Sequence, residues 1–239
     1  MAVQLEICAN SFHSALLAET AGADRIELCD NLAEGGTTPS IGLVMHCLEQ
    51  LSIPVFPIIR PRAGGFVYDA AEIKIMRHEI RAFRKAGVKG LVLGALTKSL
   101  EVDINCCKDL LQESEGLEVT FHRAIDLCTN PEHALNILQE LGFKRVLTSG
   151  GKATALEGIQ LLKKFSSMQN LQLEIVAGSG INSQNVGRLL TDVPALAGIH
   201  TTAKKSKHNT NSMFPDSNFD TDPNEVKSLK DLLRHHISS

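Results

Sequence analysis

The sequence predicts an α/β protein of the (β/α)8 TIM-barrel type, folded as one domain over residues 1–239. Short runs of β-branched and aliphatic residues alternate with segments of helical periodicity along nearly the whole chain. The alternation gives eight strand–helix units, which is the count of this barrel. The length also lies within the range of one such domain. A doubly wound sheet is the structural alternative, but it usually has fewer strands and needs no eighth unit.

The predicted strands are short apolar runs, at residues 2–8, 24–29, 54–60, 89–93, 117–122, 145–149, 172–177 and 197–201. The predicted helices follow them in turn, at residues 11–22, 40–51, 69–87, 101–115, 131–141, 153–167, 182–191 and 224–236. Ser11 suits the N-cap of the first helix, and Pro131 suits the first position of the fifth. Gly22, Gly87 and Gly142 fit the ends of helices.

One segment departs from this alternation. Residues 203–223, between the last strand and the last helix, are rich in Lys, Ser, Asn, Thr and Asp and show no periodicity. A connection of this length is long for a compact domain, so we expect a flexible polar loop. Because it follows the last strand, it would leave from the C-terminal face of the barrel. A lid, a mobile surface loop and a contact between subunits are all compatible with that position.

Composition excludes several classes of function. The 24 Lys and Arg against 27 Asp and Glu give a formal net charge of −3, which argues against binding to nucleic acid or an anionic membrane. Aromatic residues make up only 4% of the chain, so base-stacking platforms are not expected. The sequence shows neither a secretory signal pattern nor a membrane span. We therefore expect an intracellular chain whose six cysteines are mostly thiols.

Strand alternation places many polar side chains inside the predicted barrel. The helix-facing side chains of a barrel strand are apolar, so the residues that alternate with them face the lumen. The side chains predicted to face the lumen or its mouth are Glu6, Cys8, Arg25, Glu27, Cys29, Arg60, Thr120, His122 and His200, with Arg62 in the loop after Arg60. Unpaired charges there would cost several kcal/mol each, so we expect ion-pair networks such as Arg25 with Glu6 or Glu27.

These polar networks have two interpretations. They could serve only to specify the fold, or they could form a site, because catalytic groups collect at the C-terminal ends of barrel strands. Under the second interpretation, Glu6, Glu27 and His122 are candidate catalytic residues for acid/base chemistry. Histidine titrates near neutral pH, which suits that role. The alternative for His122 is a hydrogen-bonded core histidine.

The arginines and one glycine turn indicate an anion site. The candidate anion-binding residues are Arg25, Arg60, Arg62, Gly178, Ser179, Gly180 and His200. The Gly-Ser-Gly turn precedes a predicted helix start, where backbone N–H groups can bind phosphate, although tight turns need glycine for other reasons too. Together these residues favour an enzyme that acts on a small anionic or phosphorylated metabolite.

Two of the six cysteines occupy equivalent positions. Cys8 and Cys29 end neighbouring predicted strands and both face inward. Because adjacent strands lie about 4.8 Å apart, the two thiols could approach one soft metal ion such as Cu(I). The alternative is that they are inert small hydrophobes. That second interpretation is the one we favour for Cys47, Cys106, Cys107 and Cys128.

Several motifs, in the same order along the chain, resemble the CutC copper-homeostasis family. They are Ile26-Glu27-Leu28-Cys29, Glu34-Gly35-Gly36-Thr37-Thr38-Pro39-Ser40, Ile59-Arg60-Pro61-Arg62, Thr120-Phe121-His122-Arg123-Ala124 with Asp126, and Arg145-Val146-Leu147-Thr148-Ser149-Gly150. The likeness extends over about residues 3–202. Two departures stand out: relatives often carry three glycines at residues 178–180, and commonly a cysteine and an arginine at Thr201 and Lys204.

The resemblance implies a cytosolic TIM barrel, with the nucleus as an alternative location, that forms homo-oligomers and handles copper. Cys8 and Cys29 match the cysteines proposed to bind Cu(I) in the family. Two functions therefore stand as predictions. One is a copper-homeostasis protein that binds Cu(I) through cysteine thiols at the mouth of the barrel. The other is an enzyme of unknown reaction on a small anionic metabolite. A purely structural role has no positive support in the sequence.

Overall fold

The computed structural model of the chain describes residues 3–206 and 219–236. Eight parallel strands form one sheet in the order β3-β2-β1-β8-β7-β6-β5-β4. The strands are β1 (Gln4–Ala9), β2 (Arg25–Leu28), β3 (Val55–Pro57), β4 (Gly90–Leu93), β5 (Glu118–Phe121), β6 (Arg145–Thr148), β7 (Glu174–Gly178) and β8 (Gly198–Thr201). The two ends of this order meet, because Ile58 forms a parallel bridge with Val92. The Ile59 N–H also donates to the Val92 carbonyl at 2.7 Å. The sheet therefore closes into a barrel, which confirms the predicted fold class and excludes a doubly wound sheet.

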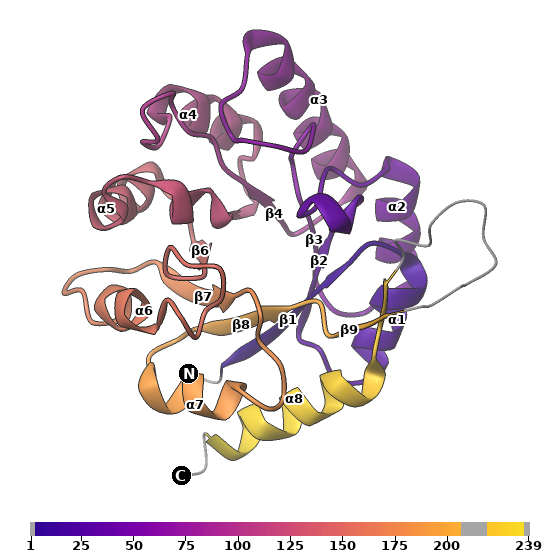
Figure 1. Cartoon of the computed structure of the whole chain (residues 1–239). Coiled ribbons are helices and arrows are strands. Elements are labelled where there is room, and N and C mark those ends of the chain that lie inside the picture. Colours follow the sequence, from indigo (N-terminus) through magenta and orange to yellow (C-terminus); the bar gives the residue numbers. More distant parts are fainter. Residues whose placement is uncertain (1–2, 207–218, 237–239) are drawn as a thin grey trace.

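The described residues form eight α-helices, which lie around the outside of the strands (Figure 1). They are α1 (Phe12–Thr20), α2 (Ile41–Gln50), α3 (Ala70–Ala86), α4 (Ile104–Glu113), α5 (Pro131–Leu141), α6 (Ile159–Ser166), α7 (Val186–Asp192) and α8 (Pro223–His236), with short 3-10 helices at Leu32–Glu34 and Arg123–Leu127. As predicted, Ser11 caps α1 and Pro131 starts α5. Within the described residues, no helix has the length and apolar character that crossing a membrane would require.

The hydrophobic core lies between the strands and the helices. Ile7, Leu28, Leu93, Phe121 and Ile199 belong to it and are fully buried. These residues alternate along their strands with the ones predicted to face the lumen. A second, smaller apolar cluster contains Cys8, Cys29, Phe56, Ile58 and Val92, which lie on the opposite faces of their strands. Strand alternation thus separates an apolar outer layer from a lumen of mixed character.

Helix α6 begins at Ile159, whereas the sequence predicted a start near residue 153. The difference has a steric cause. A Cβ atom on Gly158 would lie 1.9 Å from the Ser149 carbonyl oxygen, and one on Gly150 would lie 2.3 Å from the Gly158 carbonyl oxygen. The two backbones are therefore in direct contact, and Gly150 also has a φ of +71°, which favours glycine. This contact keeps the segment before Ile159 in a turn.

The connection after β8 differs from the predicted structureless loop at both of its ends. β9 (Lys204–Ser206) pairs antiparallel with β10 (Phe219–Thr221). The Thr221 N–H donates to Ser14 Oγ of α1 at 3.3 Å, which fixes the hairpin against the barrel. Three residues are too few for the alternation that indicates a strand, so neither β9 nor β10 was predicted. The rest of the predicted loop, residues 207–218, lies outside the described residues.

Candidate functional site

A buried ion network joins β1, β2 and β8 inside the lumen. Glu6 is in register with Arg25 on one side and with His200 on the other. Arg25 Nε donates to Glu6 Oε2 at 2.5 Å, and His200 Nδ1 lies 2.7 Å from Glu6 Oε1. Burial would raise the pKa of Glu6, but Arg25 and His200 outweigh it and lower that pKa to about 2. The expected pairing of Arg25 with Glu6 is therefore confirmed, and Glu6 is an ionised partner of the Arg25 guanidinium and the His200 ring.

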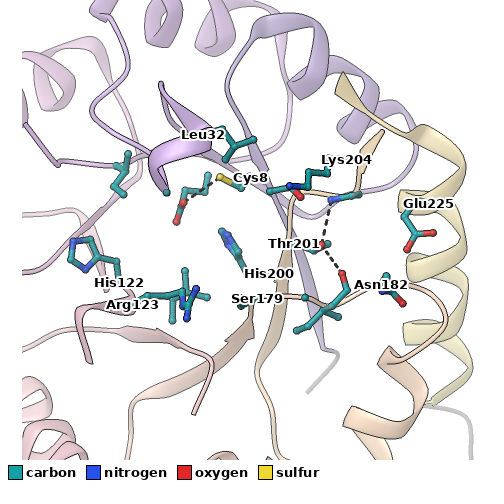
Figure 2. A pocket seen from close by; sticks show the side chains of 18 of the residues that line it. Cys8, Leu32, His122, Arg123, Ser179, Asn182, His200, Thr201, Lys204 and Glu225 are labelled. Atoms are coloured by element: carbon teal, nitrogen blue, oxygen red, sulfur yellow. Dashed lines mark hydrogen bonds between the residues drawn. The ribbon is translucent and has the colours of Figure 1, made fainter. Parts of the chain in front are cut away.

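Nearer the mouth of the barrel, two thiols, a carboxyl and an imidazole come together. Cys8 Sγ lies 3.6 Å from Cys29 Sγ and 3.5 Å from Glu27 Oε1. Cys8, Glu27 and His200 each offer one candidate ligand atom, and these atoms lie within 4.8 Å of one another. Figure 2 shows Cys8 and His200 beside each other in the middle of the pocket. The cluster combines the soft sulfur and borderline nitrogen donors that suit Cu(I).

Two acidic groups of this cluster, the Cys8 thiol and the Glu27 carboxyl, have raised pKa values. The hydrogen bond with Cys29, burial and the nearby Glu27 carboxyl raise the pKa of Cys8 well above its ordinary value. Burial also raises the pKa of Glu27, although His200 acts in the opposite direction. At neutral pH Cys8 is therefore a thiol. A metal ion must displace its proton, so metal binding here is expected to strengthen as pH rises.

A cavity of about 870 Å³ opens at the C-terminal ends of the strands. Glu27, Arg60 and His122 line it, and each side chain is at most 5% exposed. Three buried atoms of these residues, Glu27 Oε2, Arg60 Nε and His122 Nε2, have no hydrogen-bond partner in the part of the chain that the structure describes. Buried polar atoms are nearly always paired in folded proteins. Three unpaired ones around one cavity indicate a place where a polar ligand binds.

The structure separates the predicted site residues into two groups. Those that line the cavity are Cys8, Glu27, Arg60, His122, Ser179, Gly180 and His200. Glu6 and Arg25 lie deeper in the lumen, and Cys29 is fully buried against Cys8. Gly178 packs against Leu147, where a Cβ atom would lie 2.7 Å from Leu147 Cδ1.

Arg62 lies outside the cavity. It pairs with Glu72 of α3, and it donates to the carbonyls of Gly65 and Val67. These contacts fold the loop between β3 and α3 around the guanidinium. The neighbouring Arg60, in contrast, lines the cavity. The two arginines of the Arg-Pro-Arg motif therefore have different surroundings.

The glycine turn after β7 lies in the cavity wall, but a carboxylate of the chain already bonds the residues that follow it. The Ser183 N–H donates to Glu225 Oε1 at 2.6 Å, and the Ser183 hydroxyl donates to Glu225 Oε2 at 2.8 Å. Ser179 Oγ donates to the Ala153 carbonyl at 2.7 Å. Glu225 of α8 also lines the cavity (Figure 2). An external anion at this turn would meet that negative charge, so the geometry supports Arg60 better than the turn as an anion site.

With this geometry established, comparison with known proteins assigns the chain to a family. Residues 3–205 match the model of the CutC family. The chain belongs to the CutC family. It is 39% identical to a CutC family protein of Histophilus somni over 243 aligned positions, covering 97% of this chain and 100% of the relative. It is also 43% identical to the human copper homeostasis protein cutC homolog over 203 positions, covering 85% of this chain and 74% of the relative.

Solved structures agree with this assignment. The crystal structure of a copper homeostasis protein CutC from Streptococcus agalactiae superposes on this CutC-family chain with a TM-score of 0.80 and 32% identity, covering 84% of this chain and 98% of that one. A phosphoribosylanthranilate isomerase from Thermotoga maritima has a TM-score of 0.63 at 14% identity, covering 98% of this chain and 99% of that one. The second likeness shows the barrel fold alone.

Sequence reasoning missed one buried charge in the lumen of this CutC-family chain. Arg145 of β6 is 4% exposed and donates to Glu118 Oε2 at 2.6 Å. Its guanidinium carbon and that of Arg25 each lie 5.0 Å from the centre of the Phe56 ring. The direction of β6 side chains was ambiguous in the sequence. Its register, which pairs Arg145 with the inward Thr120, was the missing information.

Proposed function

We propose that this CutC-family chain is a copper-homeostasis protein that binds Cu(I) through the thiols of Cys8 and Cys29 at the mouth of the barrel. The observation that carries the proposal is the 3.6 Å between the two sulfur atoms. Thiolate ligands select Cu(I) over hard cations. The name of the human relative, a copper homeostasis protein, is consistent with this role.

His200 and Glu27 support the proposal as neighbours of the sulfur pair. Histidines that bind metals usually donate their other ring N–H to a carboxylate, which fixes the ring. His200 Nδ1 lies 2.7 Å from Glu6 Oε1, and this bond orients the ring beside Cys8. The Glu27 Oε2 atom, which has no hydrogen-bond partner in the described residues, provides a further ligand atom for a metal at the same place. The residues present therefore fit a soft cation.

The proposal also describes how the ion would reach its ligands. Cys8 lines the cavity, whereas Cys29 is fully buried. An ion that enters from the cavity therefore meets Cys8 before Cys29. We include in the proposal that the protein acts in the cytoplasm, where thiols stay reduced, and that it forms a homo-oligomer.

Titration of Cu(I) against the chelator bicinchoninate tests this function. We expect the variant Cys8→Ser/Cys29→Ser to bind Cu(I) at least about 100-fold more weakly than the wild type, because two thiolate ligands are lost. The matched control is Cys106→Ser/Cys107→Ser, which changes two buried cysteines of α4. It should leave the affinity unchanged. Equal affinity in the wild type and the Cys8/Cys29 variant would rule out this site.

The unpaired polar atoms favour a second candidate function. Glu27 Oε2, Arg60 Nε and His122 Nε2 have no partners within the described residues, and all three side chains line one cavity. A soft cation would use at most the Glu27 oxygen among them, because guanidinium and a ring N–H are donors and not ligands. We therefore also propose an enzyme that acts on a small anionic metabolite by acid/base chemistry in the lumen. Arg60, His122 and Glu27 are its candidate residues.

A further inference from the structure

We propose that Arg60 and His122 form a pocket for the negatively charged oxygen of a small hydroxylated carboxylic acid, and that Glu27 binds a hydroxyl group of the same molecule. This inference rests on the second candidate function and names its class of ligand. It uses three of the four buried side-chain atoms that have no hydrogen-bond partner within the described residues; the fourth is the Tyr68 hydroxyl. Arg60 and His122 lie outside the metal cluster, whereas Glu27 belongs to it, so this inference shares one residue with the copper proposal.

The guanidinium of Arg60 is held rigidly by backbone carbonyls. Nη1 donates to the carbonyls of Glu34 at 2.9 Å and Gly36 at 2.6 Å, and Nη2 donates to that of Gly64 at 2.8 Å. These neutral groups position the charge without cancelling it. None of the ion pairs found among residues 3–206 and 219–236 includes Arg60. Arg60 therefore brings a buried, fixed positive charge to the cavity wall, with Nε–H still available.

His122 contributes a second N–H donor. Its Nδ1 accepts a hydrogen bond from the Ala124 N–H at 3.3 Å. Burial, together with the nearby charge of Arg60, lowers the pKa of His122 to about 3, so the ring is neutral at pH 7. A neutral imidazole whose Nδ1 accepts a hydrogen bond carries its proton on Nε2. The unpartnered Nε2 is thus a donor.

Packing fixes the orientation of both groups. The Phe66 ring lies 4.5 Å from the His122 ring, centre to centre, and 5.2 Å from the guanidinium carbon of Arg60. Phe66 therefore touches both donors. A Cβ atom on Gly94 would lie 2.7 Å from the His122 ring, so the ring occupies space that only glycine leaves open. Rigid donors beside a buried charge are the arrangement that stabilises an oxyanion.

The third unpartnered atom narrows the class of ligand. Glu27 lines the same cavity and its buried Oε2 has no partner among the described residues. A hydroxyl group can either donate to a carboxylate or accept from a carboxylic acid. A simple inorganic anion would satisfy only Arg60 and His122. A molecule with both a carboxylate and a hydroxyl would satisfy all three. The cavity, of about 870 Å³, has room for such a small molecule.

The test uses four probes on the full chain: glycerate, propionate, glycerol and inorganic phosphate. We expect glycerate to bind most tightly, propionate and phosphate more weakly, and glycerol not measurably. Arg60→Lys and His122→Phe should each weaken glycerate binding by about tenfold or more, the loss expected for a hydrogen bond to a charged group. His122→Gln, which restores a donor near the position of Nε2, should recover part of that loss. Arg81→Lys, which changes a surface arginine paired with Glu113, serves as the control and should bind normally.

A measurement on the unmodified protein covers the case in which a variant fails to fold. With ¹⁵N-labelled histidine, the Nε2–H signal of His122 should shift when propionate or glycerate is added. If none of the carboxylates or phosphate binds, the second candidate function fails together with this inference. If glycerate binds but Arg60→Lys and His122→Phe bind it as tightly as the wild type, only this inference fails. A His122 signal that does not move while glycerate binds would also overturn it.

Discussion

Replacement of Arg25 by methionine should lower the free energy of unfolding by about 3–5 kcal/mol, the usual cost of breaking a buried ion pair by removing one partner. Arg25 and Glu6 are 5% and 2% exposed, and the variant would leave the ionised Glu6 buried with only the His200 ring within hydrogen-bond distance among the described side chains. The guanidinium also donates to Gln4 Oε1 at 2.9 Å. Urea unfolding at pH 7 measures the change.

A surface arginine and a double variant control this experiment. Arg81→Met removes an exposed partner of Glu113 and should cost less than about 1 kcal/mol. Glu6→Met/Arg25→Met removes both charges of the buried pair and should cost less than Arg25→Met alone, because the carboxylate that loses its guanidinium partner is removed as well. If the double variant lost as much stability as the two single variants added together, the pair would not be coupled in the way that the structure indicates.

The second large effect is a dependence of stability on pH that comes from His122. Burial, with Arg60 as the second cause, lowers the pKa of His122 to about 3 in the folded protein, against 6.5 for an ordinary histidine. A base whose folded pKa is lowered contributes stability above pH 6.5 and loses it as pH falls toward 3. Between pH 7 and pH 5 this loss amounts to about 2 kcal/mol.

His122→Gln and His122→Phe remove the titrating group and keep a polar or an aromatic side chain at this position. We expect the difference in unfolding free energy between the wild type and either variant to shrink by about 2 kcal/mol from pH 7 to pH 5. Unfolding in urea across that range measures it. Wild-type and variant curves that run parallel would show that His122 is not kept neutral by the fold.

Much of the fold could be predicted because its signals are local. Strand–helix alternation and helix caps such as Ser11 depend on neighbouring residues, and they indicated the barrel. The alternation of side chains along each strand then placed Glu6, Arg25 and Glu27 inside the barrel. This alternation predicts the inward side chains because every barrel strand has one apolar face against the helices. The approach of Cys8 to Cys29 follows from the same rule and from the pairing of adjacent strands.

The remaining features depend on contacts between distant residues. The inward direction of the Arg145 side chain follows from the register of β6 against β5. The residues of β6 alone do not contain that information. The bonds of Glu225 to Ser183 connect α8 to the segment before α7, 42 positions away, and they put the chain's own carboxylate beside the predicted phosphate turn. The different roles of Arg60 and Arg62 depend on which loop carbonyls each meets. No pattern within a single segment contains these facts.

The central claim is that Cu(I) is held by the sulfur atoms of Cys8 and Cys29, and X-ray absorption at the copper edge of the Cu(I)-loaded protein tests it most directly. The proposed site predicts a shell of about two sulfur atoms around copper, because thiolates are the preferred ligands of this ion. That shell should disappear in Cys8→Ser/Cys29→Ser and persist in Cys106→Ser/Cys107→Ser. Copper surrounded only by oxygen and nitrogen in the wild type, or an unchanged sulfur shell in the Cys8/Cys29 variant, would contradict the claim.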